Sequence, residues 1–271
     1  MPASPTNSRA TETAAMSLPD GTIDAFHRGR FFLVQPRGRG HRAGMDAMVL
    51  AAAVPSAFAG RLADFGAGAG AAGLAVAARC EGASLVLIER APEMAAFARL
   101  SLALPQNAGI AERASVLEAD VGLTGKARVA AGLEDSSFDY VIMNPPFNAR
   151  HDRATPDELR RQAHVMDEDP FAAWIRSAAA VLRPRGGLAL IARPSSLRAV
   201  LDAMDGRFGS AQILAIHPRP GATAIRIVVR AVRASRAALS ISPPLVLHET
   251  GDAFSARADA INNGRASLFG D

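Results

Sequence analysis

The chain has 271 residues and a formal net charge of +4, with 49% hydrophobic and 21% charged residues. This size and balance predict a soluble globular protein with a large core. The longest apolar runs are too short to cross a bilayer, and residues 1–20 lack the basic start and apolar centre of a secretory signal. We therefore expect a cytoplasmic protein with no membrane partner. Lys126 is the only lysine, so arginine carries nearly all the positive charge, and charge alone is weak evidence for nucleic acid.

The N-terminal part predicts a tail, a hairpin and a short helix. Residues 1–20 are rich in Ser, Thr, Pro and Ala without an apolar period, which is typical of a flexible tail. Residues 22–27 and 30–35 are β-prone on either side of Arg28-Gly29, and this pattern predicts a hairpin. A basic, glycine-rich loop then leads to an alanine-rich stretch, residues 47–54, which we expect to be helical.

The middle of the chain alternates between short apolar runs and helical segments. Strands are expected at residues 61–65, 84–88, 114–118 and 138–143. Helices are expected between the first three of them, ending near Arg79 and Leu104. This alternation predicts an α/β protein with a parallel, doubly wound sheet.

A long polar segment, residues 148–170, divides this region from the rest. Residues 171–182 and 195–204 predict helices, with strands at 188–192, 211–217 and 224–232. No helix fits between the last two strands, so they should be antiparallel neighbours. A short strand at 245–247 and a helix at 252–262 complete the prediction.

A glycine-rich turn joins the first of the alternating strands to its helix. Asp64 is followed by Gly66, Gly68 and Gly70, and glycines in such a turn let the backbone approach a ligand closely. The spacing differs from that of dinucleotide folds, and no Gly-Lys-Ser/Thr pair of a P-loop is present. The turn is therefore a nucleotide-binding candidate of moderate specificity.

Two carboxylates follow the next two strands. Glu89 ends the second strand, where it can accept both hydroxyls of a ribose, and Asp120 follows the third, where it can accept from an adenine amine. Each residue could instead be a helix cap or a surface charge. At the ends of successive strands, together with the glycine turn, they predict a site for an adenosine-containing ligand.

The fourth strand ends at Asn144-Pro145-Pro146-Phe147. The two prolines fix two φ angles and remove two backbone donors, so the turn should be stiff. The Asn144 side-chain oxygen and the Pro145 carbonyl can accept from a planar NH2 group and aim its lone pair at an electrophile, while Phe147 stacks on the ring that carries the amine. This is catalysis by positioning and fixed dipoles. A structural turn that merely ends the strand is the alternative.

With these motifs, residues 30–233 resemble the class I S-adenosylmethionine-dependent methyltransferases. The resemblance implies a seven-stranded Rossmann-like sheet with the last strand antiparallel, and S-adenosyl-L-methionine as cofactor. It also implies that the glycine turn from Asp64 to Gly70 wraps the methionine part, that Glu89 holds the ribose, that Asp120 contacts adenine and that Asn144 grips the amine.

The segment before the glycine turn is similar to bacterial enzymes that methylate adenine N6 beside the anticodon of a valine tRNA. From these enzymes Gly44 and Asp46 are carried over as residues that close over the cofactor. One departure is Phe147, where those relatives often have tyrosine. The resulting domain organisation is a tail (1–20), a hairpin and helix capping the cofactor site (21–60), the methyltransferase core (61–235) and a C-terminal extension (236–271).

Several substrates remain open. An N6-adenine methyltransferase acting on tRNA or another structured RNA is the first interpretation. Guanine N2 of ribosomal RNA, or a protein glutamine amide, suits the same four residues, whereas a small-molecule methyl acceptor suits them less well. A non-catalytic RNA-binding protein is the alternative outside enzymes. No metal is expected, because His41, His151, His164 and His217 are scattered along the sequence.

Two arginine clusters are candidates for phosphate binding in such an RNA. One lies at Arg37, Arg39 and Arg42, with His41 among them. The other lies in the long polar segment, at Arg150, Arg153, Arg160 and Arg161. A solvated loop or helix face explains each cluster equally well.

Overall fold

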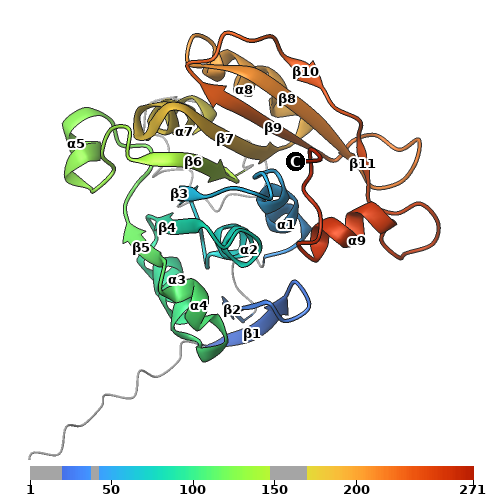
Figure 1. Ribbon diagram of the computed structural model, residues 1–271, viewed down its shortest axis with the longest axis horizontal. Helices are drawn as coiled ribbons and strands as arrows, with labels where there is room; N and C mark the ends of the chain where they lie inside the picture. Colours follow the sequence, from blue (N-terminus) through green and yellow to red (C-terminus); the bar gives the residue numbers. More distant parts are fainter. Residues whose placement is uncertain (1–19, 38–42, 147–169) are drawn as a thin grey trace, which may run out of the picture.

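A mixed sheet of nine strands organises the part of the chain that the structure describes, residues 20–37, 43–146 and 170–271 of a computed structural model (Figure 1). Its strands are β3 (Gly60–Phe65), β4 (Ala83–Glu89), β5 (Ala114–Glu118), β6 (Phe138–Met143), β7 (Leu182–Ala192), β8 (Phe208–His217), β9 (Arg226–Arg233), β10 (Ser240–Ile241) and β11 (Leu245–Val246). Their order is β10-β8-β9-β7-β6-β3-β4-β5, and β11 pairs with β8.

The pairing is parallel from β5 through β4, β3 and β6 to β7. Strand β9 is antiparallel to both β7 and β8, as the short β8–β9 connection requires. The expected count of seven strands is wrong for this sheet. The two-residue strands β10 and β11 extend it from the C-terminal segment, and both run parallel to β8.

Helices cover both faces of the sheet. The face of the larger core cluster carries α1 (Met45–Ala52), α2 (Ala71–Arg79), α3 (Pro92–Ala103), α4 (Ala108–Ala111) and α9 (Ala256–Asn262). The opposite face carries α7 (Pro170–Val181) and α8 (Leu197–Met204). Helix α5 (Gly125–Ala130) lies between β5 and β6, and the short 3-10 turns are η1 (Pro105–Asn107) and η2 (Pro194–Ser196).

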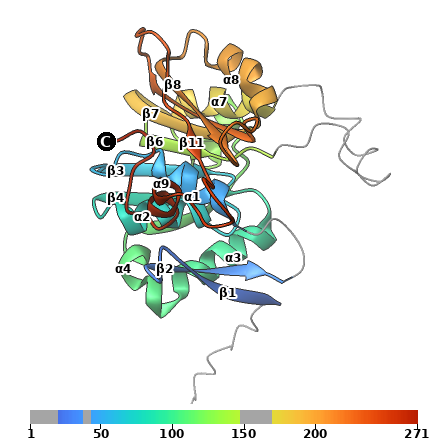
Figure 2. The ribbon, with the colours of Figure 1, turned by 90° about the vertical axis from the view of Figure 1, so that its right-hand side faces the viewer.

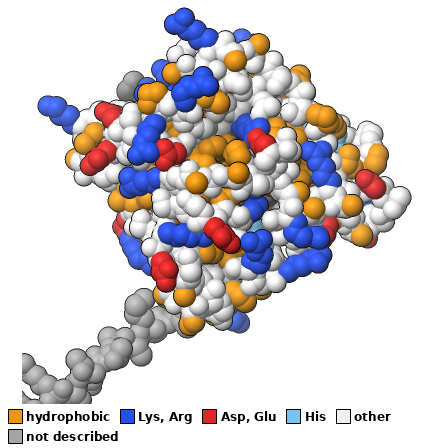
Figure 3. All heavy atoms as spheres, viewed as in Figure 1, with side chains coloured by type: hydrophobic (Ala, Val, Ile, Leu, Met, Phe, Trp, Pro, Cys, Tyr) orange, Lys and Arg blue, Asp and Glu red, His pale blue; other side chains and the backbone are white. Residues whose placement is uncertain are grey.

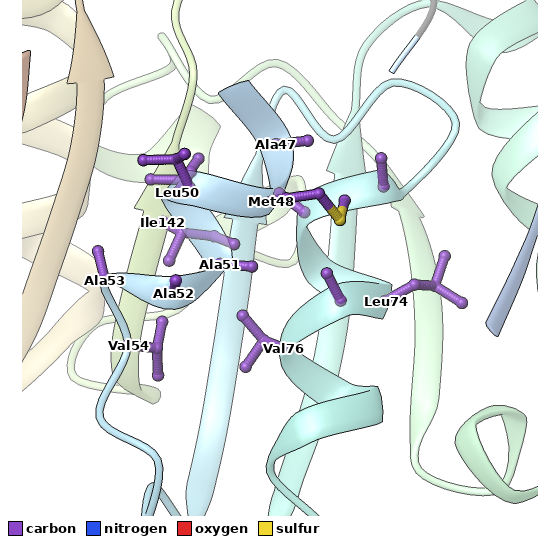
Figure 4. Packing of buried hydrophobic residues seen from close by; sticks show 14 of the residues in the cluster. Ala47, Met48, Leu50, Ala51, Ala52, Ala53, Val54, Leu74, Val76 and Ile142 are labelled. Carbon is purple, nitrogen blue, oxygen red and sulfur yellow. The ribbon is translucent and has the colours of Figure 1, made fainter. Parts of the chain in front are cut away.

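Alternate residues of the central strands enter opposite cores. On β6, Tyr140 and Ile142 pack into the cluster with α1 and α2, whereas Val141 and Met143 pack into the cluster with α7 and α8. Both faces are covered, which explains why these strands appear in the sequence as continuous apolar runs. Helix α1 is almost entirely buried, and Figure 4 shows Leu50 and Ala51 close to Ile142.

Strand β7 begins six residues earlier than the apolar run predicts. Leu182 already pairs with Phe138, and the ladder then shifts register before Gly187 pairs with Tyr140. Arg185 has a φ of 70° within this irregularity. A Cβ on Gly187 would lie 2.3 Å from the Tyr140 ring, so the bulge between Leu182 and Gly187 leaves room for this buried tyrosine.

The predicted hairpin is present as β1 (Gly21–Phe26) and β2 (Phe31–Pro36). It lies beside α3 and α4 at one end of the molecule (Figure 2). The Val34 N–H donates to Ser101 Oγ at 2.9 Å, and the Phe32 N–H donates to Asn107 Oδ1 at 2.9 Å. The Asn107 side-chain NH2 group donates to the Phe32 carbonyl at 2.6 Å. Side chains thus occupy the edge of β2 that faces away from β1.

Candidate active site at the carboxyl edge of the sheet

Strand register brings the ends of four parallel strands to one edge. Phe65 of β3 pairs with Ile88 of β4 on one side and with Met143 of β6 on the other. Glu89, the last residue of β4, pairs with the last residue of β5. The glycine turn, Glu89, Asp120 and Asn144 therefore start from adjacent strand ends, which is the edge where open α/β sheets bind ligands.

The glycine turn needs each of its three glycines. Gly66, Gly68 and Gly70 have φ angles of 69°, 56° and 97°, a region that disfavours residues with a Cβ. A Cβ on Gly70 would also lie 2.8 Å from Leu74 and Leu87. The Gly66 and Ala67 N–H groups both donate to the Ile88 carbonyl, at 2.9 and 3.0 Å, which fastens the turn to the end of β4.

Glu89 is bound to the glycine turn by its side chain. Its Oε2 accepts from the Gly68 N–H at 2.9 Å, and its Oε1 accepts from the Ala91 N–H at 2.8 Å. The residue is only 9% exposed. A carboxylate has about four acceptor positions, so both oxygens can still accept from a ligand while the backbone holds them in place.

Asp64 lies beneath the turn and is buried. Its Oδ2 accepts from the Gly73 N–H, in the first turn of α2, at 2.8 Å. Burial raises the pKa of Asp64 to about 7; the Gly73 hydrogen bond opposes this shift and the charge of Glu89 adds to it. The side chain therefore takes up a proton near neutral pH, which sequence reasoning did not anticipate.

Replacing Asp64 with asparagine tests this protonation. Between about pH 4 and pH 7 the folded state keeps a proton that the unfolded chain has lost, so the free energy of unfolding falls as pH rises and is level above pH 7. From pH 5 to pH 8 the loss amounts to ~2–3 kcal/mol. We expect Asp64→Asn to lack this part of the decline in urea unfolding. Asp252→Asn, at a fully exposed side chain, is the control; identical pH profiles for Asp64→Asn and the parent protein would contradict the assignment.

Asp120 lies beside Glu89 and is more exposed. The Ala119 N–H donates to the Glu89 carbonyl at 3.2 Å, which joins the two strand ends. The Asp120 Oδ1 accepts from the Gly122 N–H at 2.7 Å, and its Oδ2 is 3.6 Å from Arg90 Nη1. With 43% of its side chain exposed, Asp120 can accept from a ligand. Nothing in the sequence indicated the contact between Asp120 and Arg90.

Asn144 follows Met143 directly and has an unusual environment. Its Oδ1 is buried and has no hydrogen-bond partner among the residues that the structure describes. Leaving such an acceptor unpaired costs about 1–3 kcal/mol, so a retained unpaired oxygen calls for an explanation. Pro145 is buried and Pro146 is exposed, whereas Phe147 lies outside the described residues and stays a prediction.

Gly44 and Asp46 lie at the start of α1. They are at the same edge of the sheet, on the side of β6 that carries β7 and β9. Gly44 is the N-cap residue and is exposed. The Asp46 Oδ2 accepts from Arg226 Nε at 2.8 Å, and Ile227, next to Arg226, pairs with the last residue of β7. This ion pair joins the start of α1 to the start of β9. Arg226 is 180 residues away from Asp46, and sequence reasoning did not identify it.

Trp174 is a further neighbour of the glycine turn. It lies on α7 and is partly buried, and a Cβ on Gly66 would lie 2.4 Å from its Cη2 atom. The indole therefore forms a wall on the α7 face of the turn. The only available signal was that this is the single tryptophan of the chain.

Neither a membrane-spanning helix nor a metal cluster is present in the described residues. No helix among them is long and apolar enough to cross a membrane. Within the same part of the chain, no group of three or more His, Cys, Asp or Glu side chains is arranged to hold a metal ion. The arginine clusters predicted to bind phosphate, apart from Arg37, lie outside the described residues.

Comparison with known proteins defines the class to which this fold and edge belong. The chain is similar to a predicted O-methyltransferase, protein Atu636 from Agrobacterium tumefaciens, at 49% identity and a TM-score of 0.72, covering 82% of this chain and 98% of that one. It is a methyltransferase, and S-adenosyl-L-methionine is its cofactor. The model of the methyltransferase small domain family matches residues 42–219, and the chain belongs to that family.

More distant structures share the fold alone. The 16S rRNA N2 G1207 methyltransferase of T. thermophilus, solved with AdoMet and guanosine, has 20% identity and a TM-score of 0.52 over 78% of this chain and 50% of that one. A type I restriction-modification methyltransferase subunit from Streptococcus thermophilus has 12% identity and a TM-score of 0.55 over 83% of this chain and 53% of that one. A search of curated proteins gives no significant match.

Proposed function

We propose that this methyltransferase modifies an exocyclic amine, adenine N6 of a tRNA or another structured RNA. The observation that carries the proposal is the Oδ1 of Asn144, which is buried at the strand end beside the glycine turn and has no hydrogen-bond partner among the described residues. An NH2 group on a base is the donor that such an acceptor lacks, and binding it would remove the cost of the unpaired oxygen. A hydroxyl acceptor of the methyl group offers a single proton and no planar amine to reorient.

The residues at the edge fit the cofactor. Ribose hydroxyls and the adenine amine are donors, and the carboxylates of Glu89 and Asp120 are acceptors with positions left to accept. At Gly68 a Cβ would meet only Met94 Cε, at 3.7 Å, so the backbone there can approach a ligand. We propose that Asp64 and the three glycines of the turn bind the methionine part, and that the hairpin and α1, with Gly44 and Asp46, close over the cofactor.

The cofactor would supply a methyl group on a sulfonium. As the amine nitrogen bonded to that methyl, the carbon–sulfur bond would break, the neutral thioether would leave with the bonding electrons, and the amine would release one proton to water. The residues of the chain orient the amine. Asn144 Oδ1 and the Pro145 carbonyl accept from the two amine hydrogens and turn the nitrogen lone pair out of the ring plane. Phe147 is proposed to stack on the base. In a structured RNA the adenine must leave its stack to reach this turn.

A labelled-methyl assay tests the substrate. The protein is incubated with S-adenosylmethionine carrying a labelled methyl group and, separately, with an unmodified tRNA transcript pool, ribosomal RNA, and cellular protein; the products are digested to nucleosides or peptides. We expect the label in N6-methyladenosine from tRNA. Asn144→Ala protein is the matched control for contaminating activity.

Other products would replace the proposal. Label in N2-methylguanosine or methylglutamine would keep the role of Asn144 and change the substrate. The A. tumefaciens relative is described as a predicted O-methyltransferase, and this favours O-methylation as the second candidate. Label in a ribose 2′-O-methyl nucleoside or a small hydroxyl compound, with Asn144→Ala still active, would overturn amine methylation.

A further inference from the structure

A groove of about 600 Å³ lies between α7 and α8, apart from the residues assigned to the cofactor. Both helices cover the face of the sheet opposite α1 and α2. The groove is lined by Ala172, Arg176, Ser195, Arg198, Ala199, Asp202, Ala203 and Arg207. No proposed step of methyl transfer uses these residues.

One end of the groove opens at the carboxyl edge of the sheet. Strand β7 ends at Ala192, and Ser195 follows within the turn that leads into α8. The other end is at Arg207, directly before β8 begins at the amino edge. Helix α8 has eight residues and is about 12 Å long at 1.5 Å per residue. The groove thus leads away from the edge that carries Asn144 for about the length of α8.

The lining of the groove is positively charged, with three arginines against one carboxylate. Arg198 and Asp202 are 3.6 Å apart, with side chains 92% and 72% exposed, and a surface pair of this kind contributes little to stability. Arg198 can therefore exchange this partner at little cost. Within the described part of the chain, the guanidinium of Arg207 makes only a long bond, 3.4 Å, to the Asp205 carbonyl. Arginine binds phosphate through its planar fork.

Charge by itself would not single out this region. Basic side chains are spread over the face shown in Figure 3, among acidic, neutral and hydrophobic ones. The groove differs because its three arginines share one shallow, open hollow that begins at the carboxyl edge of the sheet.

We propose that the groove between α7 and α8 binds the phosphate backbone of the RNA whose base is methylated. Phosphate contacts position a nucleic acid without reading its sequence, and here they would hold the strand beside the nucleotide that enters the site. The inference rests on the proposed function, because it requires an RNA substrate. An acidic protein partner is the competing occupant.

A pair of double variants tests the groove. Arg198→Ala with Arg207→Ala removes two charges from it. Arg185→Ala with Arg265→Ala removes two exposed charges elsewhere, at the β7 bulge and after α9. Fluorescence anisotropy with a labelled, unmodified tRNA transcript gives the Kd at several salt concentrations. We expect the groove variant to bind at least ~10-fold more weakly, with the slope of log K against log salt reduced by about 2, or about 1 per arginine. The control should stay within about twofold of the parent.

Binding of S-adenosylmethionine is measured on the same preparations and should be unchanged in both variants, which shows that the groove variant is folded. Equal affinities of groove and control variants for RNA, or no RNA binding by the parent protein, would overturn the inference. Failure of the substrate assignment is recognised separately: label in a nucleoside other than N6-methyladenosine leaves the groove result standing.

Discussion

Replacing Asn144 with alanine is expected to lower kcat for methyl transfer by at least ~10²-fold, the size of effect seen when one fixed hydrogen-bonding group is removed from a catalytic site. The Kd for S-adenosylmethionine should stay within a few-fold, because the glycine turn and Glu89 are bound to each other without Asn144. Stopped assays with saturating cofactor and isothermal titration measure the two quantities.

The environment of Asn144 makes this variant informative. Its Oδ1 accepts no hydrogen bond within the described part of the chain, so the alanine variant removes an uncompensated acceptor and should keep its Tm. Asn144→Asp is the matched variant: it keeps an acceptor oxygen of the same reach and should lose less activity than alanine. A rate that does not change in Asn144→Ala would remove this residue from the mechanism.

Glu89→Ala is expected to weaken S-adenosylmethionine binding by about 10–100-fold. The carboxylate accepts from the Gly68 and Ala91 N–H groups, and a hydrogen bond to a charged group contributes about 1.5–3 kcal/mol, or roughly one to two factors of ten. Losing both bonds frees the turn, and any contact with the ribose disappears with them. Isothermal titration gives the affinity, and thermal unfolding shows whether the variant is folded.

Glu118→Ala is the matched control for Glu89→Ala. Glu118 is the register partner of Glu89 on β5, but its side chain is 40% exposed and pairs with Arg99. The affinity of this variant for S-adenosylmethionine should stay within about twofold. Equal affinities of Glu89→Ala and the parent protein would rule out both the support of the turn and the proposed ribose contact.

The sequence predicts the strand framework because local signals settle it. Apolar runs define β3, β4, β5 and β6. The interval between residues 217 and 224 is too short for a crossover helix, so β8 and β9 must run antiparallel. Convergence of the glycine turn, Glu89, Asp120 and Asn144 follows from parallel pairing alone, and the observed register confirms it. Their roles in binding and catalysis stay predictions.

Features that depend on long-range packing could not be predicted. Strands β10 and β11 have two residues each, too few for any periodicity. The protonation of Asp64 follows from burial under α2, the pair between Asp46 and Arg226 joins residues far apart in the chain, and Trp174 meets Gly66 only after α7 docks on the sheet. Each depends on three-dimensional proximity that composition and spacing do not encode.

The side chains that bond to β2 have a consequence for self-association. A strand with unoccupied N–H and C=O groups is a template on which a second molecule can add a strand. In this hairpin Ser101 and Asn107 take the place of that second strand, satisfying the Phe32 and Val34 N–H groups and the Phe32 carbonyl. Ser101 and Asn107 therefore shield this edge of β2 from a second molecule, and loss of Asn107 would leave the Phe32 N–H and carbonyl open to strand addition.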